Sequence, residues 1–195
     1  MKSFVPLLCV LLHAPFVSAE DAKPICLSNG DPAPVFEATD DQGNRWNLKD
    51  HLGKRMVVVY FYPADMTSLC TTQACSFRDT LEELADAGVM VVGVSGDSAR
   101  NHQLFKKSHS LNFPLLADED GKVARMFGVP VRKGGEITRV IQGKQEKLIR
   151  GVTAQRWTFV IGLDGRIIHR DTDVNAADNG KTVLKFVRQM TVAAQ

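Results

Sequence analysis

Short apolar runs alternate along this chain with stretches whose apolar residues recur at helical spacing. The runs over residues 56–62 and 89–95 are continuous, β-branched and aromatic, which is typical of strands buried on both faces. Between them the helical period continues up to Gly88, and glycine commonly follows the last residue of a helix. The pattern therefore predicts a strand–helix–strand unit with a right-handed parallel crossover.

The remaining segments extend this unit into a mixed sheet. Asp164 and Gly165 separate two apolar runs, which is a strong hairpin signal. A C-terminal helix is predicted around residues 183–190, with Asp178 or Asn179 as its cap. We expect an α/β fold with a mixed central sheet flanked by helices. The other predicted elements are strands at 34–38, 45–48, 113–117, 157–161 and 166–170, and helices at 98–109 and 122–127.

Residues 132–150 form the least regular segment, with six basic and two acidic residues. Such a segment is usually a solvated loop or hairpin, and this is our expectation here. The alternative is a docking surface for an acidic partner.

The first 19 residues have the pattern of a secretory signal peptide. Lys2 is the only charge before Glu20, an apolar stretch follows it, and Val17-Ser18-Ala19 fits a cleavage site. An uncleaved anchor is the alternative, but the apolar stretch is short for a span of about 20 residues. We expect cleavage near Ala19, export, and no stable membrane insertion afterwards. Residues 20–30 would then be an N-terminal extension, and residues 31–195 one domain.

Composition narrows the functional classes. A chain of 195 residues with 44% hydrophobic residues suits one globular domain and argues against a wholly disordered chain. The net charge of +2 gives no general attraction to nucleic acid. Four cysteines are too few for a disulfide scaffold. Cys9 would leave with the signal peptide, so Cys26, Cys70 and Cys75 would remain in an oxidising compartment.

Cys70 and Cys75 lie near the start of the predicted helix, on opposite faces. Cys70 belongs to the apolar stripe that continues through Ala74 and Phe77, whereas Cys75 belongs to a polar face. Unpaired N–H groups and the helix dipole in the first turn favour a thiolate, which attacks peroxide oxygen to give a sulfenic acid. Five helical residues span about 7.5 Å and about 140°, so a disulfide requires the segment from Thr67 to Phe77 to unwind.

Spacing alone leaves other interpretations open. The two thiols could form a structural disulfide in a secreted binding module, or be inert. A thiol–disulfide oxidoreductase usually has Cys-x₂-Cys, and a copper-delivery protein would need Cys-x₃-Cys and a histidine ligand. No metal or cofactor motif is evident. The histidines at 51, 102, 109 and 169 fit no such motif, so we expect them at the surface or in the core.

The segment around Cys70 resembles the active-site segment of peroxiredoxins. It reads Tyr60-Phe-Tyr-Pro-x-Asp-x-Thr-x-x-Cys70-Thr-x-x-Ala-Cys75-x-Phe-Arg-Asp79. It is most similar to the bacterioferritin-comigratory-protein, or peroxiredoxin Q, subfamily, which has a second cysteine five residues after the first. The resemblance continues through residues 93–98 and 113–118 to Arg156-x-Thr-Phe-Val-Ile161, and covers the chain from about Gly30 onward.

This resemblance implies a thioredoxin-like fold and thiol-dependent reduction of hydrogen peroxide or organic hydroperoxides, without a cofactor. Cys70 would be the peroxidatic cysteine and Cys75 the resolving cysteine. Thr67 would hydrogen-bond the thiolate and peroxide, Pro63 would shield the pocket, and Arg156 would stabilise negative charge. A thioredoxin-like protein would supply electrons to a monomeric enzyme.

The sequence departs from the family pattern in three places, one of which is a pair of residues. Ser68-Leu69 stands where Pro-Gly is frequent, Trp157 replaces a small residue, and Cys26 has no counterpart. These departures leave the preferred hydroperoxide and partner open. We expect Cys26 to be a free or mispaired N-terminal thiol, and the alternatives are an intermolecular cross-link or an alternative resolving cysteine.

Overall fold

The computed structural model describes residues 25–193, and it confirms the α/β prediction. A seven-stranded mixed sheet has the order β2-β1-β5-β4-β3-β8-β9, and β6 and β7 form a separate two-stranded sheet. The strands are β1 (Glu37–Asp40), β2 (Arg45–Asn47), β3 (Met56–Phe61), β4 (Val89–Ser95), β5 (Leu115–Ala117), β6 (Val131–Ile141), β7 (Lys144–Ala154), β8 (Trp157–Ile161) and β9 (Ile167–Asp171). The helices are α1 (Ser68–Asp86), α2 (Ala99–His109), α3 (Lys122–Met126) and α4 (Asn179–Ala193), with a 3-10 turn, η1, at Leu48–Asp50. The predicted signal peptide and Cys9 lie outside the described residues.

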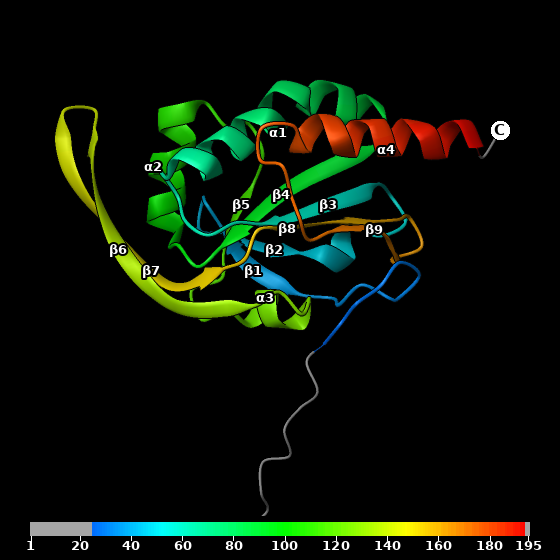
Figure 1. Cartoon of the computed structure of the whole chain (residues 1–195), viewed down its shortest axis with the longest axis horizontal. Helices are drawn as coiled ribbons and strands as arrows, with labels where there is room; N and C mark the ends of the chain where they lie inside the picture. Colours follow the sequence, from blue (N-terminus) through cyan, green and yellow to red (C-terminus); the bar gives the residue numbers. More distant parts are fainter. Residues whose placement is uncertain (1–24, 194–195) are drawn as a thin grey trace, which may run out of the picture.

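Helices cover both faces of the sheet (Figure 1). β3 is the centre of the core because its side chains alternate between two buried clusters. Val57, Val59 and Phe61 pack toward α3. Val58 and Tyr60 pack toward α1, α2 and α4. β3 pairs in parallel with β4 and antiparallel with β8, which accounts for its continuous apolar run.

The strand–helix–strand prediction is confirmed, and Gly88 ends α1 with a φ of 73°. The predicted first strand at 34–38 was wrong by about three residues. β1 begins at Glu37, after Pro32 and Pro34, which have no N–H to donate to a strand partner. It ends at Asp40, whose side chain accepts hydrogen bonds from the turn that follows.

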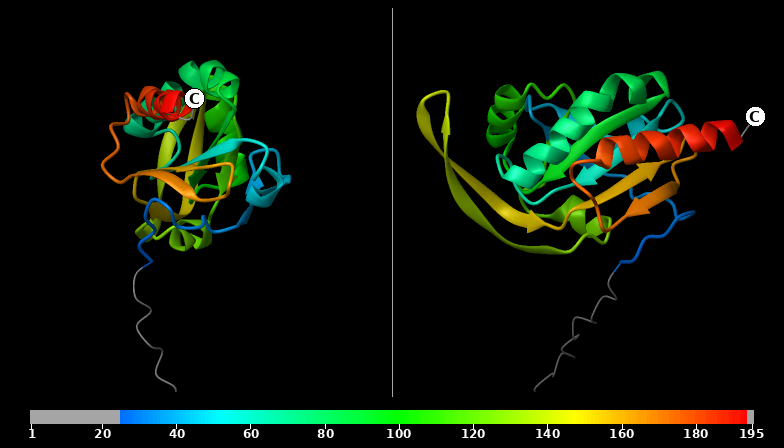
Figure 2. Two further views of the ribbon diagram at one scale, coloured as in Figure 1. Left: turned by 90° about the vertical axis from the view of Figure 1, so that its right-hand side faces the viewer. Right: turned by 45° about the horizontal axis from the view of Figure 1, so that its top comes forward.

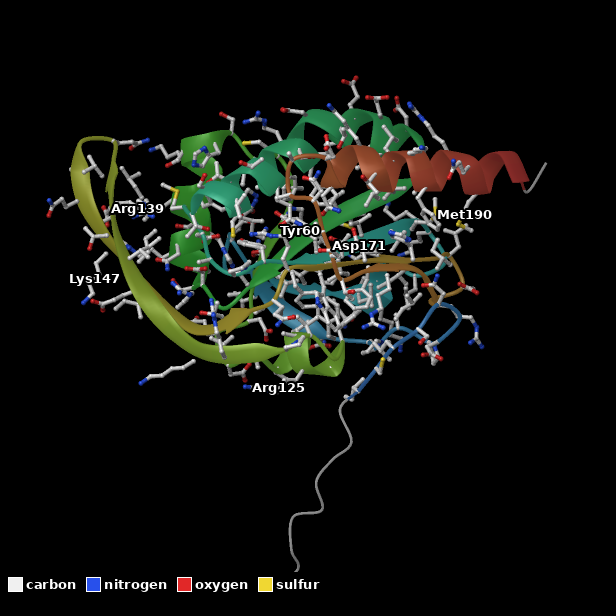
Figure 3. All side chains as sticks on the ribbon, viewed as in Figure 1. Tyr60, Arg125, Arg139, Lys147, Asp171 and Met190 are labelled. Carbon is white, nitrogen blue, oxygen red and sulfur yellow. The ribbon has the colours of Figure 1, made fainter. Side chains whose placement is uncertain are left out.

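β6 and β7 form a long hairpin that curves away from the body as an arm (Figures 1 and 2). The expectation of a loop or hairpin for residues 132–150 is therefore confirmed as a hairpin, with ladder pairs from Val131↔Ala154 to Ile141↔Lys144. At its base, Gly151 N–H donates to the Gly96 carbonyl at 2.9 Å. Arg139, labelled in Figure 3, donates from Nε to the Met66 carbonyl at 3.1 Å. The arm thus touches the loop that leads into α1.

None of the helices within residues 25–193 has the length and apolar character needed to cross a membrane.

Candidate active site

Cys70 is the third residue of α1, just beyond the carboxyl end of β3. Its side chain is 2% exposed and its thiol is free. Thr67 is the N-cap residue, but its hydroxyl makes no capping bond and instead donates to the Ala64 carbonyl at 3.0 Å. The N–H groups of the first turn therefore have no capping side chain, and together with the helix dipole they favour negative charge at this end of α1.

Arg156 brings a cation to this sulfur from the residue before β8. Its Nη2 lies 3.2 Å from the Cys70 Sγ, and its Nη1 donates to the Gln73 Oε1. The antiparallel pairing of β3 with β8, which sets Phe61 opposite Trp157, explains how residues 86 apart in sequence meet here. A guanidinium at this distance stabilises a thiolate and any negative oxygen beside it.

Gln73 links the site to the start of α4. It is fully buried, and its Nε2 donates to the Asn179 Oδ1 at 2.8 Å. Asn179 Oδ1 also accepts from Thr158 Oγ1 at 2.9 Å. Sequence reasoning considered Asn179 only as a helix cap and did not identify Gln73. A signal was present, because Gln73 is a polar residue one turn after Cys70, next to the buried Ala74.

A second buried polar network fixes the loop before Cys70. Tyr62 donates to the Asp65 Oδ1 at 2.7 Å, and His102 Nδ1 lies 2.8 Å from the Asp65 Oδ2. Asp65 N–H donates to Asp97 at 2.9 Å. Burial opposes charge on His102, but the Asp65 carboxylate outweighs it and raises the pKa of this imidazole. His102 is thus a core histidine, which is one of the two expected placements. Its partner Asp65 lies in the loop that leads into α1.

Pro63 and Arg156 also line a cavity of about 380 Å³ at the base of the hairpin. The other lining residues are Pro130, Val131, Arg132, Thr153, Ala154 and Gln155. The cavity falls in the size range of small-molecule sites. It therefore offers room for a small molecule beside Arg156, the residue whose guanidinium contacts the Cys70 sulfur.

Cys75 faces away from Cys70, as predicted. It is half-buried and free, and it lines a groove of about 1110 Å³ between α1 and α4. Continuous α-helix runs from Ser68 to Asp86, so the two sulfurs lie on different faces of an intact helix. The structure therefore brings Arg156 to Cys70, places Thr67 at the N-cap of the same helix and Pro63 in one cavity with Arg156, and keeps Cys75 on the other face.

Cys26 is an exposed free thiol, with Arg170 Nη1 3.6 Å from its sulfur. Within the described part of the chain, no group of three or more His, Cys, Asp or Glu side chains is arranged to hold a metal ion.

Comparisons with known proteins agree with this geometry. Residues 29–170 match the AhpC/TSA family. Peroxiredoxin Bcp of Escherichia coli (strain K12) is 39% identical over 163 residues, covering 84% of this chain and 97% of the relative. The crystal structure of peroxidoxin BcpB from Mycobacterium tuberculosis is 32% identical with a TM-score of 0.70, covering 84% of this chain and 98% of that one. A bacterioferritin comigratory protein of Xanthomonas campestris, studied for its alkyl peroxide reduction activity, is 29% identical with a TM-score of 0.64, covering 80% and 91%.

Proposed function

The chain belongs to the AhpC/TSA family of peroxiredoxins and is a peroxidase, and we propose that it reduces hydroperoxides through Cys70, with Cys75 as the resolving thiol. The observation that carries this assignment is the Arg156 guanidinium 3.2 Å from a buried free thiol in the first turn of α1. The cation and the helix terminus favour a thiolate nucleophile and oppose the cost of burying its charge.

In the first step the Cys70 thiolate attacks the outer oxygen of a hydroperoxide. The O–O bond breaks, an S–O bond forms, and the leaving alkoxide or hydroxide takes up a proton, which gives Cys70 sulfenic acid and an alcohol or water. Arg156 stabilises the charge that develops on the leaving oxygen. Because the Thr67 proton is committed to the Ala64 carbonyl, Thr67 serves the peroxide as a hydrogen-bond acceptor. Pro63 keeps water from one side of the sulfur.

In the second step the Cys75 thiol condenses with the sulfenic acid, forming a disulfide and releasing water. The intact helix keeps the two sulfurs too far apart, so the segment from Thr67 to Phe77 unwinds before condensation. A dithiol protein of the thioredoxin type then reduces the disulfide and becomes oxidised itself. The cavity beside Pro63 and Arg156 favours organic hydroperoxides as well as hydrogen peroxide.

We extend the proposal to a monomeric protein that is exported after cleavage near Ala19, and therefore needs an exported reductant. N-terminal sequencing of the exported protein tests the cleavage, with Glu20 expected as the first residue. An N-terminus that retains Met1 or Lys2 would refute it.

Peroxide consumption with dithiothreitol tests the chemistry in the wild type, Cys70→Ser and Cys75→Ser. The first variant should show no turnover. The second should accumulate one sulfenic acid per chain when a thioredoxin-type protein replaces dithiothreitol. Turnover that persists in Cys70→Ser would overturn the assignment.

A further inference from the structure

The first two residues of α4 hold the part of α1 that has to unwind. Asn179 accepts a hydrogen bond from Gln73 at 2.8 Å, and the Gly180 N–H donates to the Ser76 Oγ at 3.0 Å. Gln73 lies between the two thiols and Ser76 directly follows Cys75, so both belong to the segment from Thr67 to Phe77 that is proposed to unwind.

The start of α4 packs unusually close to the backbone of α1. A Cβ on Gly180 would overlap the Ser76 carbonyl and the Thr80 hydroxyl, so only glycine lets the start of α4 approach the α1 backbone this closely. Farther along α4, Val183 and Val187 join the buried cluster that contains Phe77. The two helices therefore form one packed layer (Figures 1 and 2).

We propose that Asn179 and Gly180, here called the α4 clamp, keep the first half of α1 helical and so limit the rate at which Cys75 reaches the Cys70 sulfenic acid. This inference rests on the proposed function and concerns the regulation of the same site. Unwinding α1 breaks both clamp bonds and leaves Asn179, which is 2% exposed, without its α1 partner. An interaction present in the helical form and absent from the unwound form lowers the population of the latter.

The clamp also acts on the peroxide step. Asn179 holds Gln73, and Gln73 accepts from the Arg156 guanidinium that contacts Cys70. Asn179 is thus a positioning residue that acts through two others. A tight clamp orders Arg156 for the first step but delays disulfide formation. When disulfide formation is slow, a second peroxide molecule can oxidise the Cys70 sulfenic acid to sulfinic acid, with release of water or alcohol.

Two variants separate these effects. Ser76→Ala removes one clamp bond and leaves the Asn179–Gln73–Arg156 connection in place. Asn179→Ala removes the other clamp bond, which is also the bond that holds Gln73 beside Arg156. Thr182→Ala, an exposed position in the first turn of α4, is the matched control. Because one such bond contributes about 0.5–1.5 kcal/mol net, its loss should speed unwinding about twofold to tenfold.

Rapid-mixing kinetics with hydrogen peroxide resolve sulfenic acid formation from disulfide formation, and mass spectrometry counts sulfinic acid at high peroxide. We expect disulfide formation about twofold to tenfold faster in both clamp variants, with less sulfinic acid than in the wild type. Sulfenic acid formation should be unchanged in Ser76→Ala and slower in Asn179→Ala. The control should match the wild type in both steps.

Disulfide formation that is unchanged or slower in both clamp variants would overturn the proposed role of the α4 clamp. Hydrogen exchange of the reduced variants distinguishes local loosening of α1 from misfolding of the whole protein. We expect faster exchange only in residues 71–77. The proposed function fails separately, if the wild type forms no Cys70–Cys75 disulfide at all.

Discussion

Replacing Arg156 by glutamine should slow sulfenic acid formation while leaving the fold in place. The variant removes the cation 3.2 Å from the Cys70 sulfur but keeps a polar side chain near Gln73. Two unit charges 4 Å apart near a protein surface attract by about 4 kcal/mol. Arg156 is partly exposed, so solvent weakens this attraction, and we expect its removal to raise the activation barrier by about 2–4 kcal/mol.

This increase in the activation barrier corresponds to a decrease of about 30- to 1000-fold in the second-order rate constant with hydrogen peroxide. Arg156→Lys should lie between the wild type and the glutamine variant. Lysine keeps the charge but lacks the planar fork that reaches the sulfur and Gln73 together.

Stopped-flow fluorescence of Trp157, the next residue, under excess peroxide measures the constant directly. Arg188→Gln is the control, because Arg188 is an exposed cation paired with Glu83 at the protein surface. It should change the constant by less than about twofold. A rate constant for Arg156→Gln within threefold of the wild type would refute the role given to this cation.

Three further predictions concern stability. Phe127→Ala should lower the free energy of unfolding in urea by about 3–5 kcal/mol, since its buried ring packs against Phe36, Phe61 and Phe159; a loss below 1 kcal/mol would contradict this. Gly96→Ala should cost about 1–3 kcal/mol, because the new Cβ would overlap the Val152 carbonyl at the base of the hairpin; an unchanged urea midpoint would argue against that packing. Burial opposes the charge on His102 but Asp65 raises its pKa, so the pair should stabilise the fold fully below about pH 6.5 and lose this effect as pH rises through the folded pKa; an NMR titration midpoint at or below 6.5 would show the sign to be wrong.

The elements of the central sheet were predictable because their signals are local. β4 and β8 occupy the predicted residues, and the other predicted elements of the sheet and helices are found with shifts at their ends. The pattern did not distinguish a hairpin from a loop over β6 and β7, because most residues of these strands are polar or exposed and only a few are buried. The length of the hairpin becomes clear only from the ladder between Val131 and Ala154.

The site was predictable as a motif but not as a network. Helical spacing placed Cys70 inward and Cys75 on the other face, and both placements agree with the structure. Gln73 and Asn179, in contrast, are 106 residues apart, and spacing along one helix says nothing about such a partner. His102 likewise meets Asp65 only because α2 packs beside the end of β3.

The proposed disulfide step requires α1 to unwind so that Cys75 can reach Cys70. Peptide-resolved hydrogen exchange on the reduced and peroxide-oxidised protein tests it most directly. Amides from Thr71 to Phe77 should be protected in the reduced form and lose protection in the oxidised form, while those of β3 keep theirs. Equal protection of residues 71–77 in both forms would show that α1 does not unwind.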